Sequence, residues 1–262
     1  MPKNAPPELS VIFWNIWFLS QVNPERLQEL CKRFDNLIDE YQPDVFGLNE
    51  VLISRKTGQS RLLQHLESRG YKTYFAPFGP KTETHLTGSA LVCRHEPTTV
   101  QFPELGPDAT AEWKGYKGHT TKLILARIPV AGAGTITVAV NHLAHLVPYN
   151  WRAHVKHHRS LRKITSAPDI LSGTIIGGDF NQFKFMPRMS GISDLYHRAT
   201  GTFFNPTWRL MGKPFSILRA NYDNIMWSKN GRLSLQQFSV LPRYPSDHAP
   251  LFGRFAVSKD GK

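Results

Sequence analysis

The sequence predicts an α/β protein, because short strand-like segments alternate with amphipathic helical ones along the chain. Several predicted strands are apolar throughout, which indicates sheets covered on both faces. The clearest helix follows Asn23, which is its expected N-cap. The predicted strands are Val11–Phe18, Asp44–Leu52, Gly88–Arg94, Lys122–Ile128, Thr135–Leu143, Thr174–Asp179, Tyr222–Trp227 and Leu251–Val257, and the predicted helices are Pro24–Tyr41, Gln59–Arg69 and Trp151–Ser166.

A single domain accounts for the whole chain, which has 262 residues, 40% of them hydrophobic. The sequence shows no internal repeat, low-complexity tract or long linker. We expect a flexible N-terminal segment at 1–10, one domain at 11–257 and a short tail at 258–262. Two stretches rich in Gly, Pro and polar residues, Pro103–Gly118 and Lys184–Lys213, are predicted to be surface loops.

The charge balance is strongly basic, with 32 Lys and Arg against 20 Asp and Glu and a formal net charge of +12. A positive field attracts polyanions such as nucleic acid, although the charge could also serve solubility alone. Residues 1–10 lack the apolar run of a secretion signal, and no stretch resembles a membrane span. The sequence therefore predicts a soluble, cytoplasmic protein, monomeric and without stable membrane association, whose cysteines, Cys31 and Cys93, are free thiols.

Polar side chains interrupt or end several predicted strands. Asn15 interrupts the apolar run Phe13–Trp17 and is either a structural amide or a site residue. Glu50 ends an apolar strand, where a buried carboxylate needs a partner that is either a divalent cation or an arginine. His142 ends another strand and could donate a proton near neutral pH, although a lone histidine is usually structural.

The later strands carry the more specific strings. Gly177–Asn181 reads Gly-Gly-Asp-Phe-Asn, in which two glycines allow a tight turn and strand alternation points Asp179 and Asn181 to the same side. Asp223 lies in a predicted strand, and the adjacent pair Asp247–His248 precedes the last one. A carboxylate beside an imidazole can fix its tautomer and stabilise its cationic form.

Taken in order, these strings closely resemble the endonuclease/exonuclease/phosphatase superfamily, which has the pancreatic deoxyribonuclease-like fold. The resemblance spans residues 11–257 and implies a four-layer α/β sandwich, with two β-sheets face to face and helices outside. It also implies a Mg²⁺-dependent hydrolase, with Mn²⁺ as a substitute. In this resemblance Glu50 would bind the metal, and Asn15 and Asp247 would build or support the metal site.

The resemblance implies catalytic roles for the other matching positions. Asp179 and Asn181 would orient the attacking water and a phosphate oxygen. His248, oriented by Asp223, would contact the scissile phosphate, and His142 would protonate the leaving oxygen. Histidine at position 142 resembles pancreatic-type deoxyribonucleases, sphingomyelinases and tyrosyl-DNA phosphodiesterases more than abasic-site endonucleases.

Nucleic-acid contacts are predicted outside these strings. Arg152, Lys156 and Arg159 lie on one face of a predicted helix, which is either a DNA contact or a solvated face, and Trp208 could stack bases. Histidines of the same helix could form a zinc site, but surface or packing positions account for them. The leading hypothesis is a nuclease, preferably an endonuclease, that cleaves DNA or RNA with little sequence preference. The alternatives are a phosphodiesterase or phosphatase for a lipid headgroup, terminal DNA adduct or small phosphoester, and a non-catalytic nucleic-acid-binding protein.

Overall fold

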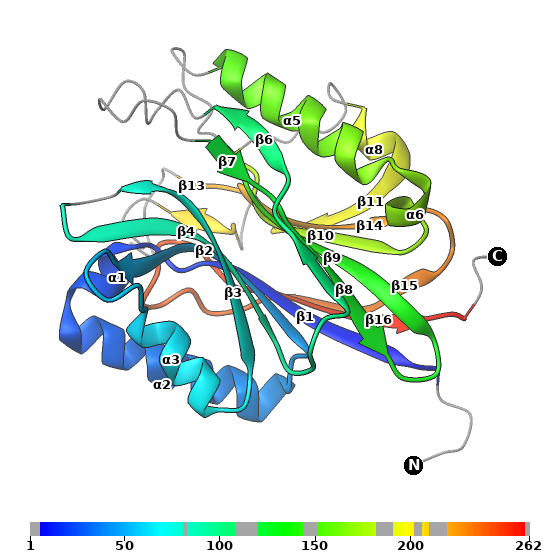
Figure 1. The fold of residues 1–262 in the computed structure, drawn as a ribbon. Helices are drawn as coiled ribbons and strands as arrows, with labels where there is room; N and C mark the ends of the chain where they lie inside the picture. The colour runs from blue at the N-terminus through cyan, green and yellow to red at the C-terminus, as the bar shows by residue number, and fades with distance from the viewer. Residues whose placement is uncertain are drawn as a thin grey trace.

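Two six-stranded β-sheets pack face to face in the computed structural model, and helices cover their outer faces (Figure 1). The structure describes residues 6–80, 83–107, 120–143, 151–181, 191–201, 206–209 and 219–259. The four-layer α/β sandwich implied by the sequence is therefore confirmed. In spatial order, the first sheet contains β15 (Leu233–Val240), β16 (Leu251–Val257), β1 (Glu8–Asn15), β2 (Val45–Ser54), β4 (His85–Cys93) and β3 (Lys72–Pro80).

The second sheet has the same number of strands and a similar plan. In this sheet β9 and β10 are parallel, and the other neighbouring strands are antiparallel. The corresponding parallel pair in the first sheet is β1 and β2. In spatial order it contains β11 (Tyr196–Thr200), β14 (Asp223–Ser228), β10 (Thr174–Asp179), β9 (Gly134–His142), β8 (Ile124–Val130) and β5 (Thr99–Gln101). Two short two-stranded sheets pair β6 (Glu104–Pro107) with β7 (Thr120–Lys122) and β12 (Trp208–Arg209) with β13 (Arg219–Ala220).

The helices occupy the outer layers. The longest, α2 (Pro24–Tyr41), packs on the first sheet together with α3 (Arg61–Ser68), and α5 (Trp151–Thr165) covers the second sheet. The Asn23 side chain caps α2, because its oxygen accepts hydrogen bonds from the backbone amides of Glu25 and Arg26. The predicted start of this helix is therefore confirmed. No helix in the described part of the chain is long and apolar enough to cross a membrane. The remaining short helices are α1 (Leu19–Val22), α6 (Pro168–Leu171) and α8 (Ile192–Leu195).

Apolar side chains fill three layers of core. The central layer lies between the sheets and is built from alternate residues of facing strands, including Val11, Phe13 and Val138. The other residues of β1, such as Ile12 and Trp14, point to the α2 side. Both faces of β1 are therefore buried, which explains why this strand is apolar throughout.

The Phe13 side chain of β1 lies directly against the backbone of β10 in the facing sheet. A Cβ atom added to Gly177 would lie 2.2 Å from the Phe13 ring, and one added to Gly47 would lie 2.4 Å from it. The next residue, Gly178, has a φ of 128° and would place a Cβ atom 2.1 Å from the backbone oxygen of Asn141. The glycine pair thus lets β10 pack closely against Phe13 of β1 and against the backbone of β9, rather than forming the tight turn expected at the strand end.

The first and last strands of the fold are neighbours. β1 pairs antiparallel with β16, with Glu8 opposite Ala256 and Phe13 opposite Leu251. β1 starts at Glu8, earlier than the predicted boundary at 11. Residues 1–5 and 260–262, which include most of the predicted terminal segments, lie outside the described residues.

Some elements differ from those predicted. The strands β3 and β15 were not expected, and the predicted loop at 103–118 begins with β6. The predicted loop at 184–213 contains α8, β11 and β12, while much of both stretches lies outside the described residues. β3 carries Pro77 and Pro80, and in β15 two adjacent glutamines break the alternation of apolar and polar residues, so neither has the regular pattern by which strands are recognised.

The histidines of α5 form the inner face of that helix. His154, His157 and His158 are buried, and the rings of His154 and His158 lie 4.7 Å apart. Both ring nitrogens of His158 lack a hydrogen-bond partner among the described residues. Burial, together with the neighbouring histidines, lowers the pKa of His158 from 6.5 to about 3. These side chains pack against the second sheet, and Phe180 lies beside His158.

The low pKa of His158 predicts acid sensitivity. Below about pH 6.5 the unfolded chain binds a proton that folded His158 refuses, so stability falls as the pH drops from 6.5 towards 3, by up to about 1.4 kcal/mol per unit. We expect His158→Leu to unfold at higher urea concentration than the wild type at pH 5, with little difference at pH 8. The exposed His197→Leu is the matched control, and equal pH dependence of wild type and His158→Leu would contradict the prediction.

Candidate active site

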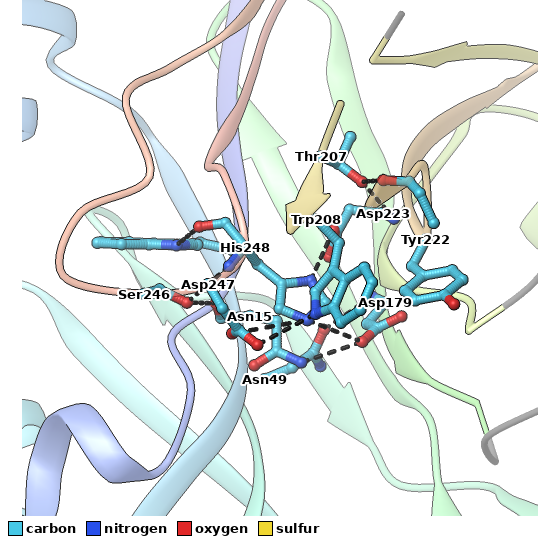
Figure 2. Close-up of polar contacts among 12 residues, drawn as sticks. Asn15, Asn49, Asp179, Thr207, Trp208, Tyr222, Asp223, Ser246, Asp247 and His248 are labelled. Atoms are coloured by element: carbon cyan, nitrogen blue, oxygen red, sulfur yellow. Dashed lines mark hydrogen bonds and ion pairs between the residues drawn. The ribbon is translucent and has the colours of Figure 1, made fainter. Parts of the chain in front are cut away.

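Polar side chains from both sheets meet at one end of the sandwich. The carboxyl ends of β1, β9 and β10 lie there with the start of β14, and the loop before β16 adds Asp247 and His248 (Figure 2). Every predicted catalytic and metal-site residue contacts another of them. The contacts join Asn15 to Glu50 and Asp179, join Asp179 to His142, Asn181 and His248, and join His248 to Asp223 and Asp247.

Asp179 stands at the centre of these contacts. Its Oδ2 accepts a hydrogen bond of 3.0 Å from Asn15 Nδ2 and lies 3.8 Å from Nε2 of both His142 and His248. Its Oδ1 accepts from the backbone amide of Asn181 at 2.8 Å. Its own backbone amide donates to Asn49 Oδ1 at 2.9 Å. The side chain and backbone of Asp179, in the second sheet, are thus both held by asparagines of the first.

His248 is oriented by Asp223. Its Nδ1 donates a hydrogen bond of 2.8 Å to Asp223 Oδ2, and this contact directs Nε2 towards Asp179 and Asp247 (Figure 2). The backbone of His248 is held as well, because its carbonyl accepts from Trp14 Nε1 at 3.0 Å and its amide donates to Ser246 Oγ. These contacts therefore fix the orientation of the imidazole.

Asn181 lies just beyond β10 in a left-handed backbone conformation, with a φ of 47°. Its Nδ2 donates to the backbone oxygen of Leu143 at 2.9 Å, which ties it to the segment after His142. His142 itself packs against Phe78, with ring centroids 5.0 Å apart. The side of the site formed by β9 and β10 is therefore fixed by backbone contacts as well as by side chains.

Burial and like charges dominate the electrostatics of the site. Burial and the nearby Asp223 raise the pKa of Asp179, while His248 and Asn15 oppose this. Burial also raises the pKa of Asp247, with Glu50 adding to the effect. Burial alone would lower the pKa of His248, but the surrounding carboxylates raise it from 6.5 to about 10. The site thus concentrates negative charge around one imidazole.

Such a site fits a divalent cation. Asp247 Oδ1 is buried and has no hydrogen-bond partner among the described residues, and its Oδ2 accepts from Trp208 Nε1 at 3.1 Å. Glu50 is half-buried near Asp247 and raises its pKa. Carboxylate oxygens with free lone pairs are the ligands that Mg²⁺ and Mn²⁺ accept. Asn15 donates its amide nitrogen to Glu50 and Asp179, and its Oδ1 accepts from the backbone amide of Trp17, so these contacts suit a supporting role beside Glu50.

A second grouping of possible ligand atoms consists of Asp179, Asp223 and His248, within 4.8 Å of one another. Two of its members, Asp223 and His248, are already bonded to each other at 2.8 Å. His248 Nδ1 and Asp223 Oδ2 are thus committed to each other, which leaves one ligand atom on each of these residues. We therefore favour Glu50 and Asp247 as the metal ligands.

Several residues of the site were not predicted from the sequence. Asn49 bridges Asp179 and Ser89 through its amide, and Ser246 Oγ donates to the backbone oxygen of Asn15 at 2.7 Å. Thr207 accepts from the backbone amide of Asp223 and so joins β14 to the strand that carries Trp208. All three act on the backbone or on another side chain, and single polar residues of these types give no distinctive signal in a sequence.

The residues predicted to contact nucleic acid lie in two different places. Trp208 lies at the site, half-buried, with its ring 5.2 Å from that of Tyr222 (Figure 2). Arg152, Lys156 and Arg159 are exposed on α5, on the outer side of the layer that covers the second sheet. Contact between these basic residues and a substrate stays a prediction.

The fold and this site define a hydrolase of the phosphoester-cleaving class. The chain belongs to the Endonuclease/Exonuclease/phosphatase family, which matches residues 12–248. Members of this family hydrolyse phosphoester bonds and generally depend on a divalent metal ion. No curated protein sequence matches the chain significantly.

Solved structures share the fold at low sequence identity. An endonuclease/exonuclease/phosphatase from Beutenbergia cavernae superimposes with a TM-score of 0.74 and 19% identity, over 96% of this chain and 72% of that one. The human Nocturnin catalytic domain with bound sulfate has a TM-score of 0.68 and 21% identity, over 96% and 94%. D. rerio TDP2 with a single-strand DNA product has a TM-score of 0.67 and 17% identity, over 95% and 98%.

Metal binding should stabilise the folded protein. A cation that binds only the folded state adds about 2.7 kcal/mol at a concentration one hundred times its Kd. We expect Mg²⁺ or Mn²⁺ to raise the thermal unfolding midpoint relative to EDTA, and Glu50→Gln to remove most of this shift. Glu67→Gln, an exposed position on α3, should keep it. An unchanged midpoint of the wild type with either metal would contradict the assignment.

Proposed function

We propose that the protein is a divalent-metal-dependent phosphodiesterase that cleaves nucleic acid, with DNA favoured over RNA and internal cleavage favoured over terminal. The observation that carries the proposal is the convergence of His142, His248 and Asn181 on Asp179 beside the carboxylates of Glu50 and Asp247. Phosphodiester hydrolysis needs charge neutralisation, an oriented water and help for the leaving alkoxide. This set contains a group for each task.

His248 would bind and stabilise the scissile phosphate. Its Nδ1 is committed to Asp223, so Nε2 is the atom that can donate to a phosphoryl oxygen. Asp223 holds the ring in place and need not touch the substrate. Removing this fixed donor would lose an interaction that strengthens as charge builds up on the phosphoryl oxygens.

Asp179 and Asn181 would orient the attacking water, and His142 would protonate the leaving oxygen. Asp179 Oδ2 lies 3.8 Å from Nε2 of each imidazole, so a group that contacts this carboxylate is within reach of both histidines. Asn15 donates hydrogen bonds to both Asp179 and Glu50. It would therefore keep a fixed distance between the carboxylate that orients the water and the carboxylate that binds the metal. Bound at Glu50 and Asp247, Mg²⁺ or Mn²⁺ would neutralise phosphoryl charge.

A nucleic-acid substrate is supported by the charge of the chain and by Trp208. The formal net charge of +12 favours a polyanion over a neutral headgroup. The half-buried Trp208 indole, fixed by Asp247 at 3.1 Å, provides an aromatic surface next to the proposed metal ligand. The fold is also that of TDP2, whose structure contains a single-strand DNA product.

Cleavage of supercoiled plasmid in the presence of Mg²⁺ tests the activity. We expect nicking by the wild type, none with EDTA, and rates reduced at least about a thousandfold in His248→Ala and Asp179→Ala, because each removes a group from the reacting centre. His197→Ala changes an exposed histidine far from the site and should cleave like the wild type. Circular dichroism verifies the folding of each variant.

Near-normal nicking by folded His248→Ala or Asp179→Ala would overturn the site assignment. Absence of nicking by a folded, metal-binding wild type would overturn the endonuclease proposal. Terminal DNA adducts, lipid headgroups and small phosphoesters would then be the substrates to assay, since they require the same reacting groups. Binding of plasmid without cleavage of any of these substrates would favour a non-catalytic nucleic-acid-binding protein.

Two substitutions of Trp208 test base stacking. Trp208→Phe and Trp208→Leu both remove the hydrogen bond to Asp247, but only Phe keeps an aromatic face. Stacking of one base is worth roughly 1–3 kcal/mol, so Trp208→Leu should lose an additional factor of about ten in kcat/KM on single-stranded oligonucleotides. On a small phosphodiester such as bis(p-nitrophenyl) phosphate the two variants should match. Equal rates on oligonucleotides would contradict base stacking on this residue.

A further inference from the structure

Glu50, the proposed metal ligand, sits in an unusual stretch of backbone. It has a φ of 60°, and the register between β2 and β4 shifts between Leu48 and Val51 at this point. The left-handed region costs a residue with a side chain roughly 1–2 kcal/mol, so surrounding contacts must hold it. The bulge also removes the regular ladder bonds that a strand neighbour would supply.

The pairing of β1 with β2 ends at Asn15 opposite Asn49, and just beyond it the side chain of Gln21 bonds to the β2 backbone. Its Nε2 donates to the backbone oxygen of Glu50 at 2.8 Å, and its Oε1 accepts from the backbone amide of Leu52 at 2.9 Å. One amide thus bonds to the peptide groups on both sides of Val51. It bonds to the two residues much as a paired strand would, and it fixes the bulge in a single geometry.

The turn that carries Gln21 also holds the Glu50 carboxylate. The backbone amide of Phe18 donates to Glu50 Oε2 at 3.2 Å, three residues before Gln21. Between them, Ser20 is fully buried and donates its Oγ to the backbone oxygen of Pro245 at 3.1 Å. The short helix α1 is therefore attached both to Glu50 and to the loop that presents Asp247.

We propose that Gln21 is a positioning residue of the metal site, which acts by locking the Glu50 bulge and hence the direction of the Glu50 carboxylate. The inference deepens the proposed function and rests on Glu50 as a metal ligand. Gln21 touches neither of the catalytic histidines. It lies on the wall of a cavity of about 460 Å³ that is also lined by Gln64 of α3. Its partial exposure there leaves space for a side chain of altered shape.

Substitution by methionine separates shape from hydrogen bonding. Gln21→Met keeps the length of the side chain and removes both bonds, whereas Gln64→Met makes the same change at another residue that lines the cavity. Gln21→Asn keeps the amide but is one methylene too short to reach both partners, and it serves if the methionine variant does not fold. Mn²⁺ binding, titrated by electron paramagnetic resonance, gives a readout that is independent of any substrate.

We expect the Mn²⁺ Kd to rise about tenfold or more in Gln21→Met and Gln21→Asn, as for other residues that orient metal ligands, and to stay unchanged in Gln64→Met. Raising the metal concentration should restore much of the lost activity, which a general loss of structure would not allow. Wild-type Mn²⁺ affinity in a folded Gln21 variant would overturn the inference. Failure of the wild type itself to bind Mn²⁺ would overturn the proposed metal dependence instead.

Discussion

The close approach of the two sheets at Phe13 is the constraint on which the site depends. The Phe13 ring lies where a side chain on Gly177 would otherwise be, so β1 and β10 can come close enough for side chains to bond across the interface. Asp179 follows two residues later and is held by Asn15 and Asn49 from the opposite sheet. A larger residue at 177 would separate the sheets and pull the central carboxylate away from its supports.

This arrangement explains how so many acids can share one small volume. Each carboxylate has its own fixed donors: Asn15 and Phe18 for Glu50, Trp208 for Asp247, and His248 for Asp223. The donors hold the oxygens in place, but burial, with Asp223 beside Asp179 and Glu50 beside Asp247 adding to it, still raises the pKa of both groups. A site with this unresolved repulsion is poised for a cation, and its rigidity limits which cation geometry it accepts.

Much of the fold and site could be predicted because the signals were local. Helix α2 was predicted with its bounds and its Asn23 cap, since apolar spacing and capping chemistry are both visible over a few residues. The recurring strings at strand ends correctly identified side chains that the fold brings together. Strand β3 was not predicted because its prolines are atypical of strands. Gln21 and Asn49 were not predicted as site residues because their hydrogen-bond partners lie far away in the sequence. Such residues act through backbone geometry, which composition does not reveal.

The pairing of β1 with β16 has a consequence for synthesis of the protein. A ribosome releases Asn15 and Glu50 early, but β1 lacks its neighbour on one side until the last strand emerges. Asp247 and His248 lie just before that strand, so a chain that lacks it also lacks a fixed position for these two residues. The proposed site is therefore complete only after β16 has paired with β1.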